Sequence, residues 1–185
     1  MSRIIALSGI SGVGKSTLLQ LLAGSVPFEH LQASSLIREG RNAVSSTVTQ
    51  DQLRLTDIDE NQRFLIDGFH LAARSKSGLI VLDAHTVIEK GDELAPIKAD
   101  VFRAIGISSM IFLEDDPTVI AERRRDDANR IRPLATVDRL AQIQKAALEH
   151  ADAICLTLGI VLHVCRPNQH AAVTKALIDD NLGGR

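Results

Sequence analysis

A glycine-rich octapeptide near the start of the chain constrains the fold more than any other feature. Residues 9–16 read GISGVGKS and match the pattern G-x-x-x-x-G-K-[ST]. A short apolar run, residues 3–8, precedes this segment, and a leucine-rich segment with helical spacing, residues 15–23, follows it. A strand, a glycine loop and a helix in this order are typical of a loop whose backbone N–H groups bind phosphate at the start of a helix.

The side chains of the loop fit the same chemistry. Glycine lets several N–H groups converge on an anion because it has no Cβ in the way. We expect Lys15 to reach the outer phosphates of ATP, Ser16 to offer its hydroxyl to Mg²⁺, and Thr17 to contact a phosphate. The alternative is a glycine-rich turn that binds nothing. The predicted ATP-binding residues of the loop are Gly9, Ser11, Gly12, Val13, Gly14, Lys15, Ser16 and Thr17.

Apolar runs recur along the chain and alternate with helical patterns. The runs at residues 79–82, 109–113 and 160–165 do not alternate with polar residues, which indicates strands covered on both faces, as in a parallel sheet. With residues 3–8 and a weaker candidate at 29–33, they predict an α/β fold of three layers, with a five-stranded parallel sheet flanked by helices. Further helices are predicted at residues 56–74, 117–125, 137–156 and 169–180.

Acidic residues stand directly after two of these runs. Ligands bind at the carboxyl ends of strands in open α/β sheets, and Mg²⁺ prefers one or two carboxylates together with waters and phosphates. We therefore predict Asp83 as the acidic partner of the metal, the alternative being an aspartate that caps the next turn. For Asp115 and Asp116, a cap on the helix that starts at Pro117 is favoured. His85 is either structural or a substrate contact.

Arginine is unusually frequent, with 15 arginines and 6 lysines among the 21 basic residues. Its guanidinium group can bind phosphate through two hydrogen bonds, and phosphoryl transfer needs positive charge on the moving group. We expect Arg130 and Arg132, between two predicted helices, to be catalytic. Arg124 is a further catalytic candidate and Arg123 an ATP-binding one. For both of these, a charged helix end is the alternative.

A second anion site is predicted after the weak strand at residues 29–33. Ser34 and Ser35 are small hydroxyl residues that can cap a helix there. Arg38 then lies about one turn into that helix, where it is placed to hold a second phosphate-bearing substrate. The predicted acceptor site therefore comprises Ser34, Arg38 and His85.

Composition narrows the class of protein. A net charge of −2 argues against a general nucleic-acid binder. No apolar run reaches the roughly 18 residues of a membrane span, and the first residues lack the plan of a signal peptide. We expect a cytoplasmic protein that binds neither nucleic acid nor membrane. Cys155 and Cys165 match no zinc or disulfide pattern, so we expect them to be small core residues.

With these residues in place, the chain resembles the adenylate kinase-like nucleoside monophosphate kinases, and among them the short archaeal-type adenylate kinases. The resemblance rests on residues 9–17, on ASSLIR at 33–38, on VLDAH at 81–85, on LEDDP at 113–117 and on DDANRIR at 126–132. It implies a P-loop NTPase fold with strand order 2-3-1-4-5. It also implies transfer of the γ-phosphoryl group of ATP, with Mg²⁺, to a nucleoside monophosphate, AMP first.

The resemblance further implies a binding or catalytic role for individual residues. Lys15 and its loop would hold ATP, Arg38 the monophosphate, and Arg130 and Arg132 would close over the transferring group. Residues 1–185 would form a single kinase domain, with an acceptor-binding helical part at about 34–76, a short lid at about 126–136, and a tendency to form homo-oligomers. Two alternatives stay open: a P-loop ATPase or nucleotide-dependent switch, and a kinase of a nucleoside or another small metabolite.

The common adenylate kinase motif Asp-Gly-Phe-Pro-Arg is absent from the chain. Residues 67–70 read DGFH and begin like that motif, but they lie inside the helix predicted at 56–74. We therefore do not assign them to that motif, and we expect the apolar side of the helix to consist of Phe64, Leu65, Phe69 and Leu71.

Overall fold

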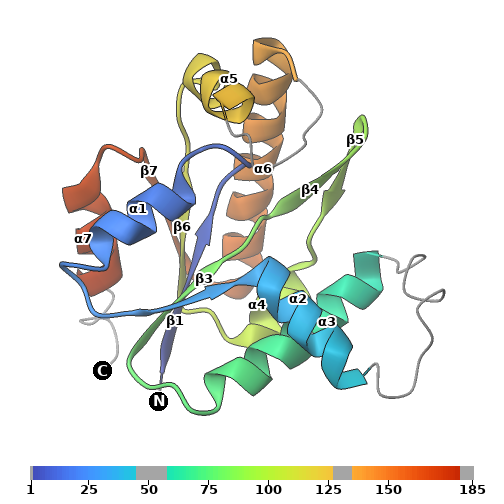
Figure 1. Cartoon of the computed structure of the whole chain (residues 1–185), viewed down its shortest axis with the longest axis vertical. Helices are drawn as coiled ribbons and strands as arrows, with labels where there is room; N and C mark the ends of the chain where they lie inside the picture. Colours follow the sequence, from blue (N-terminus) through green and yellow to red (C-terminus); the bar gives the residue numbers. More distant parts are fainter. Residues whose placement is uncertain (1, 45–57, 127–134, 180–185) are drawn as a thin grey trace.

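The centre of the molecule is a parallel sheet of five strands. The computed structural model describes residues 2–44, 58–126 and 135–179 (Figure 1). The sheet has the order β2-β3-β1-β6-β7, which is the predicted order 2-3-1-4-5 once the strands of a separate hairpin are left out of the count. Its strands are β1 (Arg3–Ser8), β2 (Glu29–Gln32), β3 (Leu79–Asp83), β6 (Ser109–Leu113) and β7 (Val161–Cys165).

Helices cover both faces of this sheet and make the predicted three layers. In Figure 1, α1 (Lys15–Leu22) and α7 (His170–Asp179) lie on one side of the strands, and α4 (Ala99–Ile105) and α6 (Val137–Leu158) lie on the other. The remaining helices are α2 (Ala33–Val44), α3 (Ile58–Ala73) and α5 (Pro117–Asp126). The P-loop NTPase fold predicted from the sequence is therefore confirmed.

Burial follows the position of a strand in the sheet. The strands β3 and β6 are buried along almost their whole length, as their unbroken apolar runs predicted. The prediction is wrong for the run at 160–165, because β7 is an edge strand in which Val161 is 54% and Val164 46% exposed. A continuous apolar run does not distinguish an edge strand from a central one.

The antiparallel hairpin of β4 (Val87–Lys90) and β5 (Glu93–Pro96) is not among the elements predicted from the sequence. Its turn contains Gly91 at φ +60°, a conformation that glycine adopts at little cost. The hairpin is tied to α6, since Arg139 donates to the Asp92 carbonyl over 2.5 Å and Thr86 donates to the Ala147 carbonyl over 2.8 Å. The hairpin therefore belongs to the packed body of the protein.

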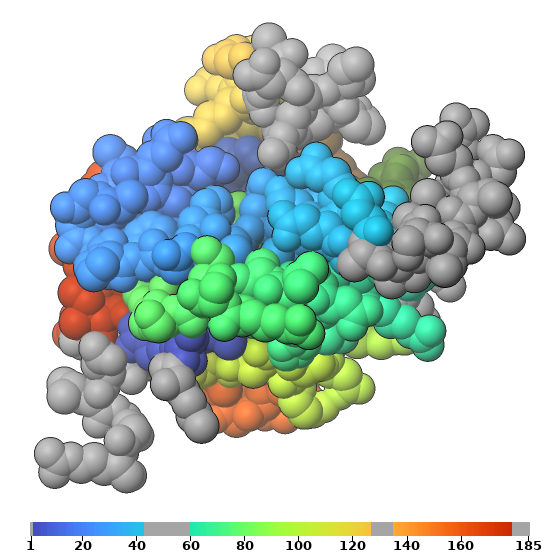
Figure 2. Space-filling model, turned by 60° about the horizontal axis from the view of Figure 1, so that its bottom comes forward, coloured from blue at the N-terminus to red at the C-terminus, as the bar shows by residue number. Residues whose placement is uncertain are grey.

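Helices α2 and α3 lie together at the surface, as Figure 2 shows, and approach each other through two glycines. A Cβ on Gly40 would lie 2.2 Å from the Phe64 carbonyl oxygen, and one on Gly68 would lie 2.1 Å from that of Leu36. Residues 67–70 are inside α3, as predicted. The placement of Leu71 on the apolar side is wrong, because this side chain is 47% exposed.

Both cysteines are buried and free, as predicted. Burial, with a smaller contribution from the charge of Asp152, raises the pKa of Cys155 to about 11, and burial also raises the pKa of Cys165. The two thiols are therefore protonated packing groups at neutral pH. Across the three ranges that the structure covers, none of the helices combines the length and the apolar content that crossing a bilayer requires.

Candidate active site

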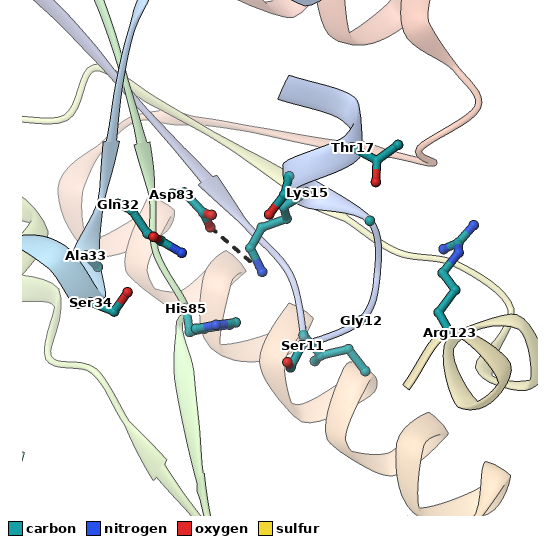
Figure 3. A pocket seen from close by; sticks show the side chains of 13 residues that line it. Ser11, Gly12, Lys15, Thr17, Gln32, Ala33, Ser34, Asp83, His85 and Arg123 are labelled. Carbon is teal, nitrogen blue, oxygen red and sulfur yellow. Dashed lines mark ion pairs between the residues drawn. The ribbon is translucent and has the colours of Figure 1, made fainter. Parts of the chain in front are cut away.

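A cavity of about 660 Å³ lies at the carboxyl ends of β1 and β3, the edge of the sheet at which ligands bind in open α/β folds. Figure 3 shows that residues from four parts of the chain face it: the glycine loop with the start of α1, the junction of β2 and α2, the end of β3, and α5. Its lining residues are Ile10, Ser11, Gly12, Gly14, Lys15, Ser16, Thr17, Gln32, Ala33, Ser34, Asp83, His85 and Arg123.

The loop has the conformation that its glycines permit. Gly9, Gly12 and Gly14 have φ values of +139°, +86° and +110°, a region that other residues rarely adopt. Helix α1 begins immediately after Gly14, which has no side chain to cap it. The positive end of the helix and the N–H groups of its first turn therefore stand at the cavity, where an anion would be stabilised.

Lys15 and Asp83 are brought together, as the positions of loop and strand predicted. The Lys15 ammonium donates to the Gly9 carbonyl over 2.7 Å and lies 3.9 Å from a carboxylate oxygen of Asp83. Both side chains are almost fully buried, at 8% and 7% exposed. His30, which was not predicted as a site residue, also approaches the pair, and its Nε2 lies 3.9 Å from the other Asp83 oxygen. No motif marks His30, and only the pairing of β2 with β3 brings it there.

On the acceptor side, the structure places two of the three predicted residues at the cavity. His85 lines it and shares a hydrogen bond of 2.9 Å between Nδ1 and the Gly9 carbonyl, and Ser34 lines it from the first turn of α2. Ser34 and Ser35 do not cap α2 from outside, because the helix already begins at Ala33. Arg38 is not a lining residue; it is exposed and donates to the Ser35 hydroxyl over 3.2 Å.

Gln32 and Ala33, which the sequence analysis did not select, complete that wall. In Figure 3, Gln32, Ala33 and Ser34 lie on one side of Lys15, whereas Thr17 and Arg123 lie on the other. The cavity is thus two-sided, with the lysine between the sides. The only signal for Gln32 and Ala33 in the sequence is their place at the end of a weak strand pattern.

The arginines of α5 contact the backbone of the glycine loop. Arg123 donates to the Val13 carbonyl over 2.9 Å and to the Asp115 carboxylate over 2.8 Å. Arg124 donates through Nε to the Ser11 carbonyl over 2.8 Å and is not a lining residue. The predicted catalytic residues Arg130 and Arg132 lie outside the described residues.

The predicted cap at the start of α5 is made by Asp116, whereas the Asp115 carboxylate accepts from Arg123. The carboxylate of Asp116 accepts a hydrogen bond of 2.8 Å from the Thr118 N–H, the local contact expected of a helix cap. This contact helps fix the start of the helix that carries Arg123 and Arg124 to the loop.

The oxygen donors at the cavity suit Mg²⁺ bound together with a polyphosphate. Among the described residues, no group of three or more His, Cys, Asp or Glu side chains could by itself hold a metal ion. Ser16 and Asp83 line the same cavity and provide a hydroxyl and a carboxylate. Mg²⁺ commonly takes one or two such protein ligands and completes its coordination with phosphates and water.

Comparisons with known proteins agree with this architecture. A family model described as an AAA domain, AAA_17, matches residues 8–141. The adenylate kinase of Thermoplasma acidophilum is 24% identical, with 94% of this chain and 93% of the relative covered. That of Pyrobaculum aerophilum is 25% identical, with the same coverage of each chain. The resemblance predicted from the motifs is therefore confirmed along nearly the whole chain.

Solved structures share the fold at lower sequence identity. A gluconokinase from Sinorhizobium meliloti superposes with a TM-score of 0.54 at 15% identity, covering 100% of this chain and 98% of its own. A shikimate kinase from Bacteroides thetaiotaomicron gives a TM-score of 0.56 at 16% identity, covering 96% and 98%. At these identities the likeness establishes the fold alone.

Proposed function

The chain belongs to the AAA_17 family of AAA domains and is an adenylate kinase-like P-loop kinase, and on this premise we propose that it transfers the γ-phosphoryl group of ATP to a nucleoside monophosphate, with AMP as the first expected acceptor. One observation carries the proposal. The cavity has a phosphate-binding loop on one side and a second polar wall on the other, with the Lys15 ammonium between them (Figure 3). Two substrates facing each other across one cation is the arrangement that phosphoryl transfer needs.

On the donor side, the loop N–H groups and Lys15 bind the β- and γ-phosphates, while Thr17 and Arg123 contact the nucleotide. Lys15 gives the transferring group a positive charge that is fixed in place before the reaction begins. Ser16 and Asp83 would hold Mg²⁺ together with the phosphates, and the bound ion would supply further charge neutralisation. Among the described residues, Lys15 and Arg123 are the lysine and arginine side chains that line the cavity.

On the acceptor side, Ser34 and His85 orient the monophosphate, and Arg38 on the same helix binds its phosphate group. A phosphate oxygen of the acceptor attacks the γ-phosphorus while the bond to the β,γ-bridging oxygen breaks, so ATP and AMP become two ADP. The helical part at about 34–76 carries the acceptor. Arg130 and Arg132, in a lid at about 126–136, stabilise the moving charge and exclude water.

A second acceptor class is favoured by one specific observation. Among the described residues, the wall formed by Gln32, Ala33, Ser34 and His85 carries no arginine, and Arg38 points its guanidinium group to Ser35. Neutral hydrogen-bonding groups suit the hydroxyl of a small metabolite as well as a phosphate. Transfer of the γ-phosphoryl group to such a hydroxyl is therefore the second candidate function.

An acceptor panel tests the proposal directly. The protein is incubated with ATP and Mg²⁺ and with AMP, the other nucleoside monophosphates, nucleosides, gluconate or shikimate in turn, and the products are followed by ³¹P NMR. We expect ADP to form from AMP and ATP together. Formation of a phosphate ester of a nucleoside, of gluconate or of shikimate would instead support the second candidate function, transfer to a hydroxyl group. Release of inorganic phosphate without any phosphorylated acceptor would instead identify an ATPase or switch protein.

The variant Arg38→Ala tests whether Arg38 contributes to binding of the acceptor and not to binding of ATP. We expect Arg38→Ala to raise KM for the acceptor about tenfold or more, the effect of losing one charge-assisted hydrogen bond, and to leave KM for ATP nearly unchanged. Initial rates at varied AMP and varied ATP measure both constants. Arg103→Ala is the matched control, because this exposed arginine pairs with Asp100 on α4. An equal rise in both KM values would remove Arg38 from the acceptor site.

A further inference from the structure

Two neighbouring arginines of α5 hold two carbonyl groups of the glycine loop. The Nε of Arg124 donates to the Ser11 carbonyl over 2.8 Å, and an Nη of Arg123 donates to the Val13 carbonyl over 2.9 Å. In a planar trans peptide the C=O and the following N–H point in opposite directions. Fixing these two carbonyls therefore also fixes the N–H groups of Gly12 and Gly14, and both glycines line the cavity.

Each arginine is itself held by a carboxylate from another part of the chain. Arg124 makes a two-pronged ion pair with Glu89 of the β4–β5 hairpin, over 2.6 and 3.1 Å. Its side chain is 7% exposed, whereas that of Glu89 is 33% exposed. Arg123 pairs with Asp115 over 2.8 Å. A guanidinium group buried this deeply depends on its counter-charge, because removing one partner of a buried pair leaves an uncompensated charge.

The stem of Arg124 also lies against the loop itself. A Cβ on Gly12 would lie 2.8 Å from the Cγ of Arg124, so the arginine packs directly on the peptide that it hydrogen-bonds. Both the Nε–H and the two outer nitrogens of Arg124 are thus engaged, by the loop and by the hairpin. Arg124 therefore packs against the glycine loop and is not among the residues that line the cavity.

We propose that Glu89 is a positioning residue for the phosphate site. It acts through Arg124, which fixes the Ser11–Gly12 peptide and so directs the Gly12 N–H toward the bound phosphates. The proposal also changes the role of Arg124 from a catalytic residue to a positioning residue. It rests on the proposed function only in taking the triphosphate of ATP as the ligand of the loop. The hairpin that the sequence analysis missed thereby becomes a part of the nucleotide site.

Calorimetric titration with ATP and Mg²⁺, without an acceptor, tests the proposal apart from turnover. We expect Glu89→Ala to raise the Kd for ATP about tenfold. This is the effect of losing one hydrogen bond to a charged group, here the bond from the Gly12 N–H to a phosphate. Glu89→Gln keeps an acceptor oxygen for the guanidinium group and should recover most of the affinity. Glu93→Ala, on the exposed face of the same hairpin, is the matched control and should bind ATP as the wild type does.

A double variant decides whether Glu89 acts through Arg124. We expect Arg124→Ala to weaken ATP binding at least as much as Glu89→Ala does, and the double variant to bind no more weakly than Arg124→Ala alone. If Glu89→Ala weakens binding equally in both backgrounds, the proposal is overturned. It is also overturned if Glu89→Ala lowers the Tm and leaves the Kd unchanged, because that result describes a purely structural ion pair.

The same titration separates this inference from the proposed function. A wild-type protein that binds ATP but phosphorylates no member of the acceptor panel would remove the kinase assignment and leave the role of Glu89 to be decided by the double variant. A wild-type protein that binds no ATP would overturn both.

Discussion

Replacing Lys15 by alanine is expected to lower kcat for phosphoryl transfer by about a thousandfold, the loss seen when a preorganised charge on a developing transition state is removed. The reason is geometric: Lys15 is the cation between the two walls of the cavity, and its ammonium is already 3.9 Å from the carboxylate of Asp83. The effect is measured as the initial rate at which ADP forms from ATP and AMP.

Two controls keep this result interpretable. Removing Lys15 leaves Asp83 almost fully buried beside His30, which lowers stability as well as activity. Thermal unfolding followed by circular dichroism must therefore show that Lys15→Ala is folded at the assay temperature, and Lys15→Met keeps more of the buried stem. Lys145→Ala, an exposed lysine paired with Glu149 on α6, should react normally. Normal turnover by folded Lys15→Ala would refute the loop as the ATP site.

The glycine loop could be predicted from the sequence because its requirements are local. Gly9, Gly12 and Gly14 each adopt a positive φ, and their spacing is fixed by the path of the chain alone. The proximity of Lys15 to Asp83 needed one further step, the rule that the carboxyl ends of parallel strands meet at one edge of the sheet. Lys15 and Asp83, which these two arguments predict, both line the cavity.

The contacts that could not be predicted depend on partners distant in the sequence. Glu89 is 35 residues from Arg124, and it lies on a four-residue strand too short to give a periodic signal. His30 and Gln32 reach the site only because β2 pairs with β3. The sequence makes Arg123 an ATP-binding candidate and Arg124 a catalytic one, yet backbone carbonyls of the loop accept hydrogen bonds from both side chains. Sequence alone indicates that a charge is present, and packing decides what it faces.

Gly68→Ala is expected to destabilise the protein by about 2–4 kcal/mol, the range of severe overpacking in a well-packed interface. This expected loss of stability is opposite in direction to the effect of helix propensity, since alanine is favoured over glycine by roughly 1 kcal/mol in the interior of an exposed helix. Here the added Cβ would lie 2.1 Å from the Leu36 carbonyl oxygen, so α2 and α3 must move apart. Urea unfolding followed by circular dichroism gives the free energy, since the chain has no Trp or Tyr to report by fluorescence.

Gly24→Ala is the matched control, because no heavy atom lies within 4 Å of the position of its Cβ. We expect its stability to stay within about 0.5 kcal/mol of the wild type, as for most surface substitutions. Because α2 begins at the acceptor wall with Ala33 and Ser34, displacement of this helix should also raise KM for the acceptor more than the Kd for ATP. Equal stabilities of Gly68→Ala and Gly24→Ala would show that the two helices do not meet at this glycine. A stable Gly68→Ala variant with an altered acceptor KM would instead mean that the helix pair adapts by sliding, and that the acceptor wall moves with it.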